Sequence, residues 1–309
     1  MILFASGRTD IPAFYADWLI NRIHAGFVDV RNPYFGQQVT RYRLDPDVVD
    51  CLVFCTKNPM PLIPLLGELK GFPLYFFVTI TPYGKEIEPF VPQKERVMEA
   101  VRELAAKIGQ EQVAWRYDPI FVDSTYTVAA HIRAFRSMAE KLRGATERCI
   151  ISFVDLYEKT KKNFSGIREV RMEDRRFLAE SLARIGREAG ISLESCAEKE
   201  GLENTGVKKG CCVSRKIVER ASGQPLRKQL PIQRLREHCS CLAMHDIGAY
   251  NSCPHLCRYC YANYNASLVR QNFACHDADS PLLIGQPQAG DVLHEAEQES
   301  YKENQLLLF

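Results

Sequence analysis

Long apolar runs are missing from this chain, and none approaches the ~18 residues that a membrane-spanning helix needs. The run from Met1 to Ala5 is short and has no basic segment before it, so it does not resemble a secretory signal. These two absences predict a cytoplasmic protein with no membrane partner. A charge excess is missing too, because a net charge of +2 over 309 residues favours no class of partner.

The 12 cysteines are distributed unevenly along the chain. Cys51, Cys55 and Cys149 lie in apolar runs and are typical of small core residues. The other nine lie within residues 196–275. Because structural disulfides are rare in a reducing compartment, a concentration of cysteines in an intracellular protein indicates metal binding or redox chemistry.

The first 200 residues alternate short apolar runs with longer segments of helical periodicity. The predicted strands are Ile2–Ser6, Cys51–Thr56, Leu74–Thr79, Gln112–Arg116, Cys149–Val154 and Ile191–Cys196. The predicted helices include residues 93–108, 126–143 and 172–189. Repeated β-then-α order predicts an α/β fold with a parallel sheet, which is a partial or complete parallel (β/α) barrel or, as the alternative, a doubly wound sheet.

Polar residues follow the predicted strands at their carboxyl ends, in residues 7–10, 57–59, 81–84, 116–119, 155–157 and 198–199. Any one of these segments could be a solvated turn. Because all six are polar and partly charged, they favour a ligand-binding edge, which is where parallel α/β folds bind their ligands.

Cys253, Cys257 and Cys260 have the spacing CxxxCxxC. Thiolates suit iron–sulfur clusters and zinc. A [4Fe–4S] cubane usually takes four protein thiolates, so three closely spaced ones leave one iron with an open position. By itself the spacing also fits a structural zinc site or an inert loop, and His255 within it is expected to be no ligand.

The motif, with Tyr259 directly before its last cysteine, resembles the signature of the radical S-adenosylmethionine superfamily. The flanking residues YNSC (250–253) and CYAN (260–263) resemble the spore photoproduct lyase branch. Further segments resemble the ends of the second to fifth strands of that branch, namely residues 9–12, 56–59, 77–81 and 116–120. With ISFVDLY (151–157) and CAEK (196–199), the whole arrangement is similar to a bacterial domain-of-unknown-function family (DUF1848).

In the superfamily the cysteine motif follows the first strand, whereas here it lies near the carboxyl terminus. The resemblance therefore implies a circularly permuted barrel whose first strand is Leu242–Tyr250. The expected organisation is a main barrel part (1–200), a basic cysteine-rich excursion (201–241), the permuted first strand with the cluster loop (242–275) and a C-terminal tail with little core of its own (276–309).

The resemblance also implies a chemistry. The three cysteines would hold a [4Fe–4S] cluster, S-adenosyl-L-methionine would chelate its fourth iron, and reduction by a donor such as ferredoxin or flavodoxin would generate a 5′-deoxyadenosyl radical. Cofactor binding is expected of Tyr259, Thr9, Asn58 and Thr79, and catalysis of Asp10, Lys57, Arg116 and Asp118. The glycine-rich GGE stretch that holds the methionine end in the superfamily is absent, so that contact is not accounted for.

A second set of cysteines is a candidate for a Cys₄ site. The favoured ligands are Cys196, Cys212, Cys239 and Cys241, with Cys211 as the rival to Cys212. Such a site would hold a second iron–sulfur cluster or a zinc ion. Scattered free cysteines are the alternative, and Cys275 belongs to neither set.

Two further features point toward nucleic acid. Between residues 207 and 236, nine Lys or Arg residues face a single acid, Glu219, a composition that suits phosphate contacts but also a solvated helical face. Gln305–Phe309 resembles the peptide by which bacterial replication and repair proteins bind the sliding clamp; the alternative is a tail that folds back onto the protein.

The sequence therefore predicts an iron–sulfur radical enzyme of unassigned substrate, with DNA repair as the favoured setting. One alternative is a non-catalytic iron–sulfur or zinc protein that binds nucleic acid. The other is radical chemistry on a small anionic metabolite.

Overall fold

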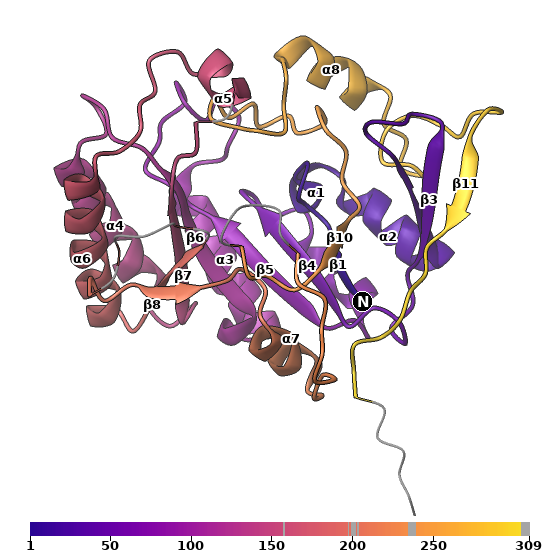
Figure 1. Cartoon of the computed structure of the whole chain (residues 1–309), viewed down its shortest axis with the longest axis horizontal. Helices are drawn as coiled ribbons and strands as arrows, with labels where there is room; N and C mark the ends of the chain where they lie inside the picture. The colour runs from indigo at the N-terminus through magenta and orange to yellow at the C-terminus, as the bar shows by residue number, and fades with distance from the viewer. Residues whose placement is uncertain (157, 197, 199–201, 203, 234–238, 304–309) are drawn as a thin grey trace, which may run out of the picture.

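The computed structural model describes residues 1–156, 158–196, 198, 202, 204–233 and 239–303. Its main feature is an eight-stranded sheet in which every strand pairing is parallel. In spatial order the strands are β10 (Met244–Asp246), β1 (Ile2–Phe4), β4 (Cys51–Thr56), β5 (Leu74–Thr79), β6 (Val113–Ile120), β7 (Arg148–Phe153), β8 (Ser192–Cys196) and β9 (Lys208–Gly210). Apart from β10, which lies beside β1 at one edge, this order follows the chain (Figure 1).

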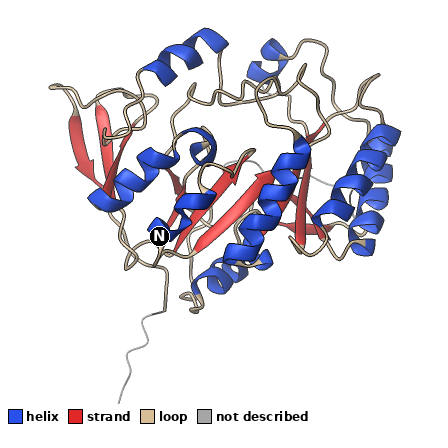
Figure 2. Cartoon of the chain, turned by 180° about the vertical axis from the view of Figure 1, so that it is seen from behind, coloured by secondary structure: helices blue, strands red, loops and turns tan. Residues whose placement is uncertain are grey.

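One face of the sheet, the helical face, is covered by amphipathic helices. These are α2 (Ala16–Ala25), α3 (Lys94–Ile108), α4 (Val128–Leu142) and α6 (Met172–Glu188). In α3, Val97, Val101 and Leu104 recur at helical spacing and are all buried, which directs one stripe of the helix into the core. Trp115 of β6 stacks on Phe135 of α4 with ring centroids 4.5 Å apart. Figure 2 shows these helices from behind the view of Figure 1.

The other face, the excursion face, is covered by the cysteine-rich segment between β9 and β10. Alternate strand residues such as Val53 and Phe77 pack there against Val213 and against Val218 of α7 (Arg215–Ser222). Because successive side chains of a strand point to opposite faces, the near-continuous apolar runs of the central strands fit a sheet that is covered on both sides. The predicted parallel α/β sheet flanked by helices is confirmed.

A second sheet of three strands, which the sequence did not predict, is formed by β2 (Phe27–Arg31), β3 (Gln38–Arg43) and β11 (Val292–Glu295). Residues 276–303 were expected to form a tail with little core of its own, but they contribute a strand and buried side chains to the fold. The indole N–H of Trp18 donates to the Ser280 carbonyl at 2.8 Å, and Leu282 and Leu283 are buried. These contacts pack the segment against α2 and β3.

The remaining elements are short. They are α1 (Ile11–Phe14), α5 (Glu158–Asn163), α8 (Ala266–Ala274) and the 3₁₀ turns η1 (Ile63–Leu69) and η2 (Gln110–Gln112). Across the described part of the chain, no helix has the length and apolar character needed to cross a membrane.

Candidate functional site

The cysteine loop follows β10 and is tied to the carboxyl end of β1. Asp246, the last residue of β10, accepts hydrogen bonds from the Gly7 N–H at 3.0 Å and from Arg8 Nε at 2.6 Å. A Cβ on residue 7 would lie 2.9 Å from the Asp246 carboxyl group, so this close approach requires glycine. The loop therefore starts at the edge of the sheet where the other parallel strands end.

Strand alternation places several polar side chains on the excursion face near this carboxyl edge. Cys55 of β4 and Arg116 of β6 point to the same face, and an Arg116 guanidinium nitrogen lies 3.9 Å from the Cys55 sulfur. The Thr79 hydroxyl of β5 lies 4.0 Å from the same sulfur. Arg116 also pairs with Asp118, which accepts a hydrogen bond from Ser152. Arg116, Asp118 and Thr79, three of the predicted site residues, thus share one region.

Glu88 organises a buried charge network beside the cysteine loop. This side chain is only 1% exposed and pairs with Lys57 at 2.7 Å and with Lys94. It also accepts hydrogen bonds from the Thr81 hydroxyl at 2.7 Å and from the Tyr259 hydroxyl. One carboxylate therefore fixes the predicted site residues Lys57 and Tyr259, and the Lys57 ammonium lies 5.5 Å from the centre of the Tyr259 ring.

The pKa values in this network follow from burial and charge. Burial raises the pKa of Glu88, but the nearby ammonium groups of Lys57 and Lys94 outweigh it and lower the pKa to about 2. For Lys57, burial lowers the pKa, yet its ion pair with Glu88 raises it overall. For Lys94, burial prevails and the pKa is lowered. At neutral pH, the Glu88 carboxylate therefore pairs with two ammonium groups, those of Lys57 and Lys94.

Asp10 and His255 form a buried pair that anchors the cysteine loop. His255 Nε2 lies 3.0 Å from the Asp10 carboxylate, and His255 Nδ1 lies 3.2 Å from the Phe90 carbonyl oxygen. The same carboxylate accepts from the Lys57 N–H at 2.8 Å and caps α1 through the Ala13 N–H at 3.2 Å. Both ring nitrogens of His255 are therefore engaged in contacts within the protein. Asp10 holds His255 and the Lys57 backbone in position.

Thr9 and Asn58 complete the predicted set. Thr9 is buried in the segment that follows β1, directly before Asp10. The side-chain oxygen of Asn58 accepts from the Met60 N–H at 3.2 Å and so serves a local turn.

Cys253, Cys257 and Cys260 lie close enough to influence one another. Burial raises the pKa of Cys253, and the neighbouring Asp10, Cys260 and Cys257 raise it further. Burial raises the pKa of Cys257 to about 12, against the opposing influence of Lys57. Leu256 between them has φ +53°, a left-handed conformation that costs roughly 1–2 kcal/mol in a residue with a Cβ. The tertiary contacts of the loop hold it in this shape.

The spacing of the three sulfurs bears on the kind of metal centre. Among the described residues, only Cys196, Cys212 and Cys241 form a group of ligands whose atoms all lie within 4.8 Å of one another. The sulfurs of Cys253, Cys257 and Cys260 do not meet this criterion. Tetrahedral zinc with Zn–S bonds of ~2.3 Å would bring sulfurs to about 3.8 Å. A cubane instead binds each thiolate to a different iron.

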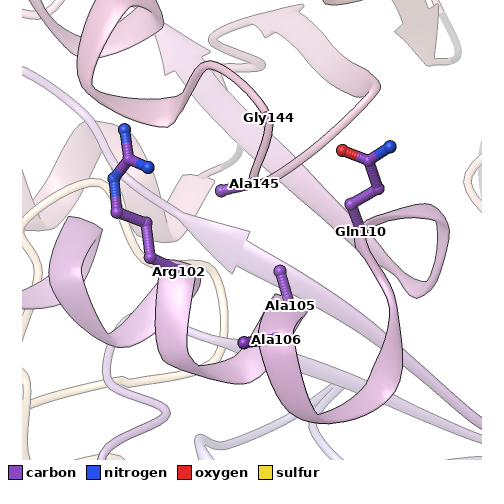
Figure 3. Close-up of a pocket in the computed structure, with 6 residues that line it drawn as sticks. All are labelled: Arg102, Ala105, Ala106, Gln110, Gly144 and Ala145. Carbon is purple, nitrogen blue, oxygen red and sulfur yellow. The ribbon is translucent and has the colours of Figure 1, made fainter.

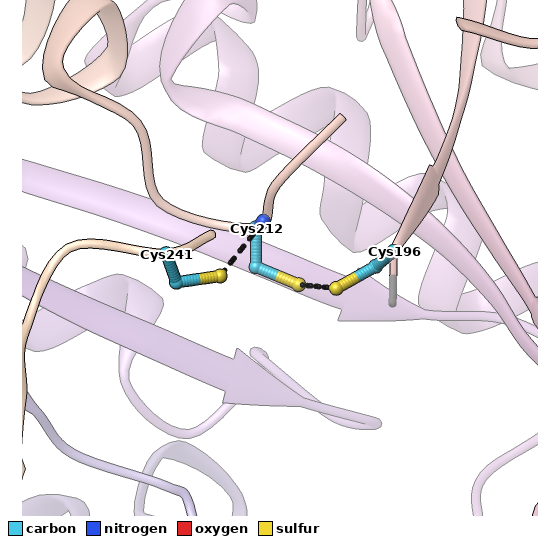
Figure 4. A group of neighbouring side chains, drawn as sticks. All are labelled: Cys196, Cys212 and Cys241. Carbon is cyan, nitrogen blue, oxygen red and sulfur yellow. Dashed lines mark hydrogen bonds between the residues drawn. The ribbon is translucent and has the colours of Figure 1, made fainter. Parts of the chain in front are cut away.

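The second cysteine set comes from three separate segments (Figure 4). Cys196 ends β8, Cys212 precedes α7 and Cys241 precedes β10. The sulfurs of Cys196 and Cys212 are 3.0 Å apart, and the Cys212 N–H donates to the Cys241 sulfur at 3.2 Å. Cys239 lies outside this group, while the Cys211 thiol is hydrogen-bonded to Cys241.

The basic excursion is partly neutralised by acids from elsewhere in the chain. Arg220 pairs with Glu147 at 3.3 Å and Arg227 with Glu299 at 3.2 Å. Arg215 donates to the carbonyl oxygens of residues 226–228 as well as pairing with Glu219. Arg215 is thus engaged within the excursion, whereas Arg220 and Arg227 form ion pairs that are largely exposed to solvent. Arg234, Arg236 and the clamp-like Gln305–Phe309 lie outside the described residues.

Two surface hollows lie at the opposite, amino end of the strands. One is lined by Arg102, Ala105, Ala106, Gln110, Gly144 and Ala145 (Figure 3). The other runs from η1 to the start of β5 and reaches Ala221 of α7. Neither contains a predicted site residue, so both lie apart from the chemistry of the carboxyl edge.

Sequence reasoning missed Glu88, Lys94 and the role of His255. Glu88 lies between β5 and α3 and Lys94 is the first residue of α3, and no periodicity distinguishes either of them. The one available signal was indirect, because a buried Lys57 at a strand end requires a carboxylate partner.

The fold and site define an α/β protein with a cysteine-bearing loop at the carboxyl edge of a parallel sheet. The chain belongs to the family described as "Domain of unknown function (DUF1848)", whose model matches residues 2–262. The match contains the CxxxCxxC motif and the second cysteine set. No curated protein and no solved structure matches the chain.

Proposed function

We propose that this protein is a radical S-adenosylmethionine enzyme whose [4Fe–4S] cluster is held by Cys253, Cys257 and Cys260. The proposal rests on the position of the CxxxCxxC loop. The loop lies at the carboxyl edge of the parallel sheet, and hydrogen bonds to buried Asp10 and Glu88 hold it there. Three cysteines leave one iron of a cubane without a protein thiolate, which is suited to a reacting cluster.

The proposal includes a circularly permuted partial barrel. The order β10-β1-β4-β5-β6-β7-β8 advances in one direction across the sheet. A doubly wound sheet would instead reverse its order at a switch point. If β10 counts as the first strand, the cysteine loop follows the first strand and the polar strand ends follow in the order of a barrel. This supports the permuted arrangement.

The residues present fit such a cofactor pair. A reduced cluster with S-adenosylmethionine on its open iron supplies one-electron cleavage of the sulfonium and hence hydrogen abstraction. The chain would supply the surroundings. Lys57 and Lys94 provide positive charge near Cys257, and Glu88 keeps both in place. Arg116 and Asp118 provide a charged pair on the excursion face for cofactor or substrate.

The proposed partners follow from the same chemistry. A cluster that cycles between two oxidation states needs a one-electron donor such as a ferredoxin or flavodoxin. DNA is the favoured substrate because the motifs resemble those of spore photoproduct lyase and because Gln305–Phe309 resembles a clamp-binding peptide. The basic excursion adds less, because Arg215, Arg220 and Arg227 are engaged within the protein.

Anaerobic reconstitution tests the proposal. We expect about four irons and four sulfides for the triplet, with the electron paramagnetic resonance signal of a reduced cubane. Dithionite-reduced protein should convert S-adenosylmethionine to methionine and 5′-deoxyadenosine. A protein that takes up only zinc, or that is reduced without cleaving S-adenosylmethionine, would contradict it.

Removal of residues 305–309 should abolish binding to a bacterial sliding clamp. The reason is that Leu306, Leu308 and Phe309 would be the apolar anchors of an extended peptide in a hydrophobic groove. Surface plasmon resonance with the immobilised clamp measures the effect. Leu293→Ala in β11 is the control, because it removes an exposed apolar side chain away from the motif and should leave binding unchanged. Clamp binding that survives the deletion would contradict the prediction.

A further inference from the structure

The second cysteine set has the geometry of a single-ion site. Cys196, Cys212 and Cys241 present three sulfurs that lie within 4.8 Å of one another. Zinc with Zn–S bonds of ~2.3 Å places its sulfurs about 3.8 Å apart. The 3.0 Å separation of Cys196 and Cys212 would have to widen by about 0.8 Å, a shift within reach of side-chain rotation.

Polar groups of the chain lie beside these sulfurs. The Cys212 N–H donates to the Cys241 sulfur, an interaction that strengthens when the sulfur is charged. The Arg116 guanidinium lies near Cys196 and Cys212 and offsets negative charge there. Arg148 fixes the intervening loop by donating to the Cys212 carbonyl oxygen at 3.1 Å and to Glu194 at 2.7 Å.

A metal ion bound to the second cysteine set would link separate parts of the chain. Cys196 ends β8 near one edge of the sheet, whereas Cys241 leads into β10 at the other edge. Cys212 belongs to the excursion that covers the face between them. Cys211 directly precedes Cys212 in the sequence, but its sulfur is not among the three that converge. A bound ion would therefore connect both flanks of the sheet across the excursion face.

We propose that Cys196, Cys212 and Cys241 bind one zinc ion, separate from the CxxxCxxC centre, which fastens the excursion to the sheet. This site is independent of the radical chemistry proposed above. Binding would contribute to folding directly, because an unfolded chain does not present the three thiolates together.

The test uses the full chain carrying Cys253→Ser, Cys257→Ser and Cys260→Ser, so that the CxxxCxxC loop can hold no cluster. After expression with added zinc, we expect about one zinc per chain and no stoichiometric iron. Adding Cys241→Ser should lower the zinc content at least tenfold. Adding Cys275→Ser, which removes an exposed cysteine outside both sets, should leave it unchanged.

A second measurement avoids the risk that a cysteine variant fails to fold. Cobalt added to the zinc-depleted triple variant should give a thiolate-to-metal charge-transfer band, and zinc should protect Cys196, Cys212 and Cys241 from iodoacetamide while Cys275 reacts. Four irons with sulfide in the triple variant would overturn the proposal in favour of a second cluster. A Cys196–Cys212 disulfide, or no bound metal, would overturn it as well.

Discussion

Cys257→Ser should reduce the iron content of anaerobically reconstituted protein from about four per chain to near zero, and 5′-deoxyadenosine formation should fall below detection. A cubane held by three thiolates loses one iron anchor with this change, and a serine hydroxyl is a much poorer ligand for iron. Burial raises the pKa of Cys257 to about 12, and the neighbouring Lys57 and Lys94 partly oppose this rise. Iron and sulfide analysis with electron paramagnetic resonance measures the loss.

Cys275→Ser is the matched control, because it removes an exposed thiol fifteen residues beyond the motif and should leave cluster and turnover intact. Circular dichroism must show the same secondary structure in both variants. A Cys257→Ser protein that still assembled four irons and cleaved S-adenosylmethionine would exclude the triplet as the cluster ligands.

The main sheet was predictable because its strands are continuous apolar runs. Cys51–Thr56 and Leu74–Thr79 form β4 and β5 with the predicted bounds, since both faces of these strands are covered. Alternation within them explains why Cys55 and Thr79, which look unrelated in sequence, meet on the excursion face. The polar residues at strand ends lie at one edge because the strands of this sheet are all parallel.

Other features depended on contacts that sequence patterns do not encode. Residues 242–250 were predicted as one strand, but only Met244–Asp246 pairs with β1. The Leu242 N–H instead donates to the Val213 carbonyl oxygen at 2.9 Å, which draws that end toward the excursion. β11 pairs with β3 across more than 250 residues, a distance over which local periodicity gives no information.

The site was predicted in part. The strand ends made Lys57 and Arg116 candidates and the resemblance made Tyr259 one, but neither predicted the carboxylate that joins Lys57 to Tyr259. Glu88 lies in a loop among other charged residues, and only its burial distinguishes it. Buried charges of this kind are determined by the assembled structure, because their partners come from different elements.

Glu88→Gln should lower the free energy of unfolding at pH 7 by ~3–5 kcal/mol, the typical cost of removing one partner from a buried ion pair. The amide carries no charge, so Lys57 and Lys94 would face each other without the carboxylate between them. Tyr259 would also lose an anionic acceptor for its hydroxyl. Urea denaturation followed by tryptophan fluorescence measures the change, since Trp18 and Trp115 are both buried.

The pH dependence gives this prediction a second, independent readout. The pKa of Glu88 falls from 4.5 to about 2 on folding, so the native state favours the ionised form. Its contribution is complete above pH 4.5 and declines as the pH falls toward 2, because the unfolded chain binds the proton first. The difference in stability between wild type and Glu88→Gln should therefore narrow over this window by up to about 3 kcal/mol.

Glu140→Gln is the matched control. Glu140 forms a solvent-exposed pair with Arg143, so its loss should leave the free energy of unfolding almost unchanged. Adding Lys94→Met to Glu88→Gln should recover part of the stability, since it removes one of the two unpaired cations. If Glu88→Gln and Glu140→Gln unfolded at the same urea concentration, Glu88 would not organise the network. A difference that stayed constant from pH 7 to pH 2 would place the cost in packing instead of charge.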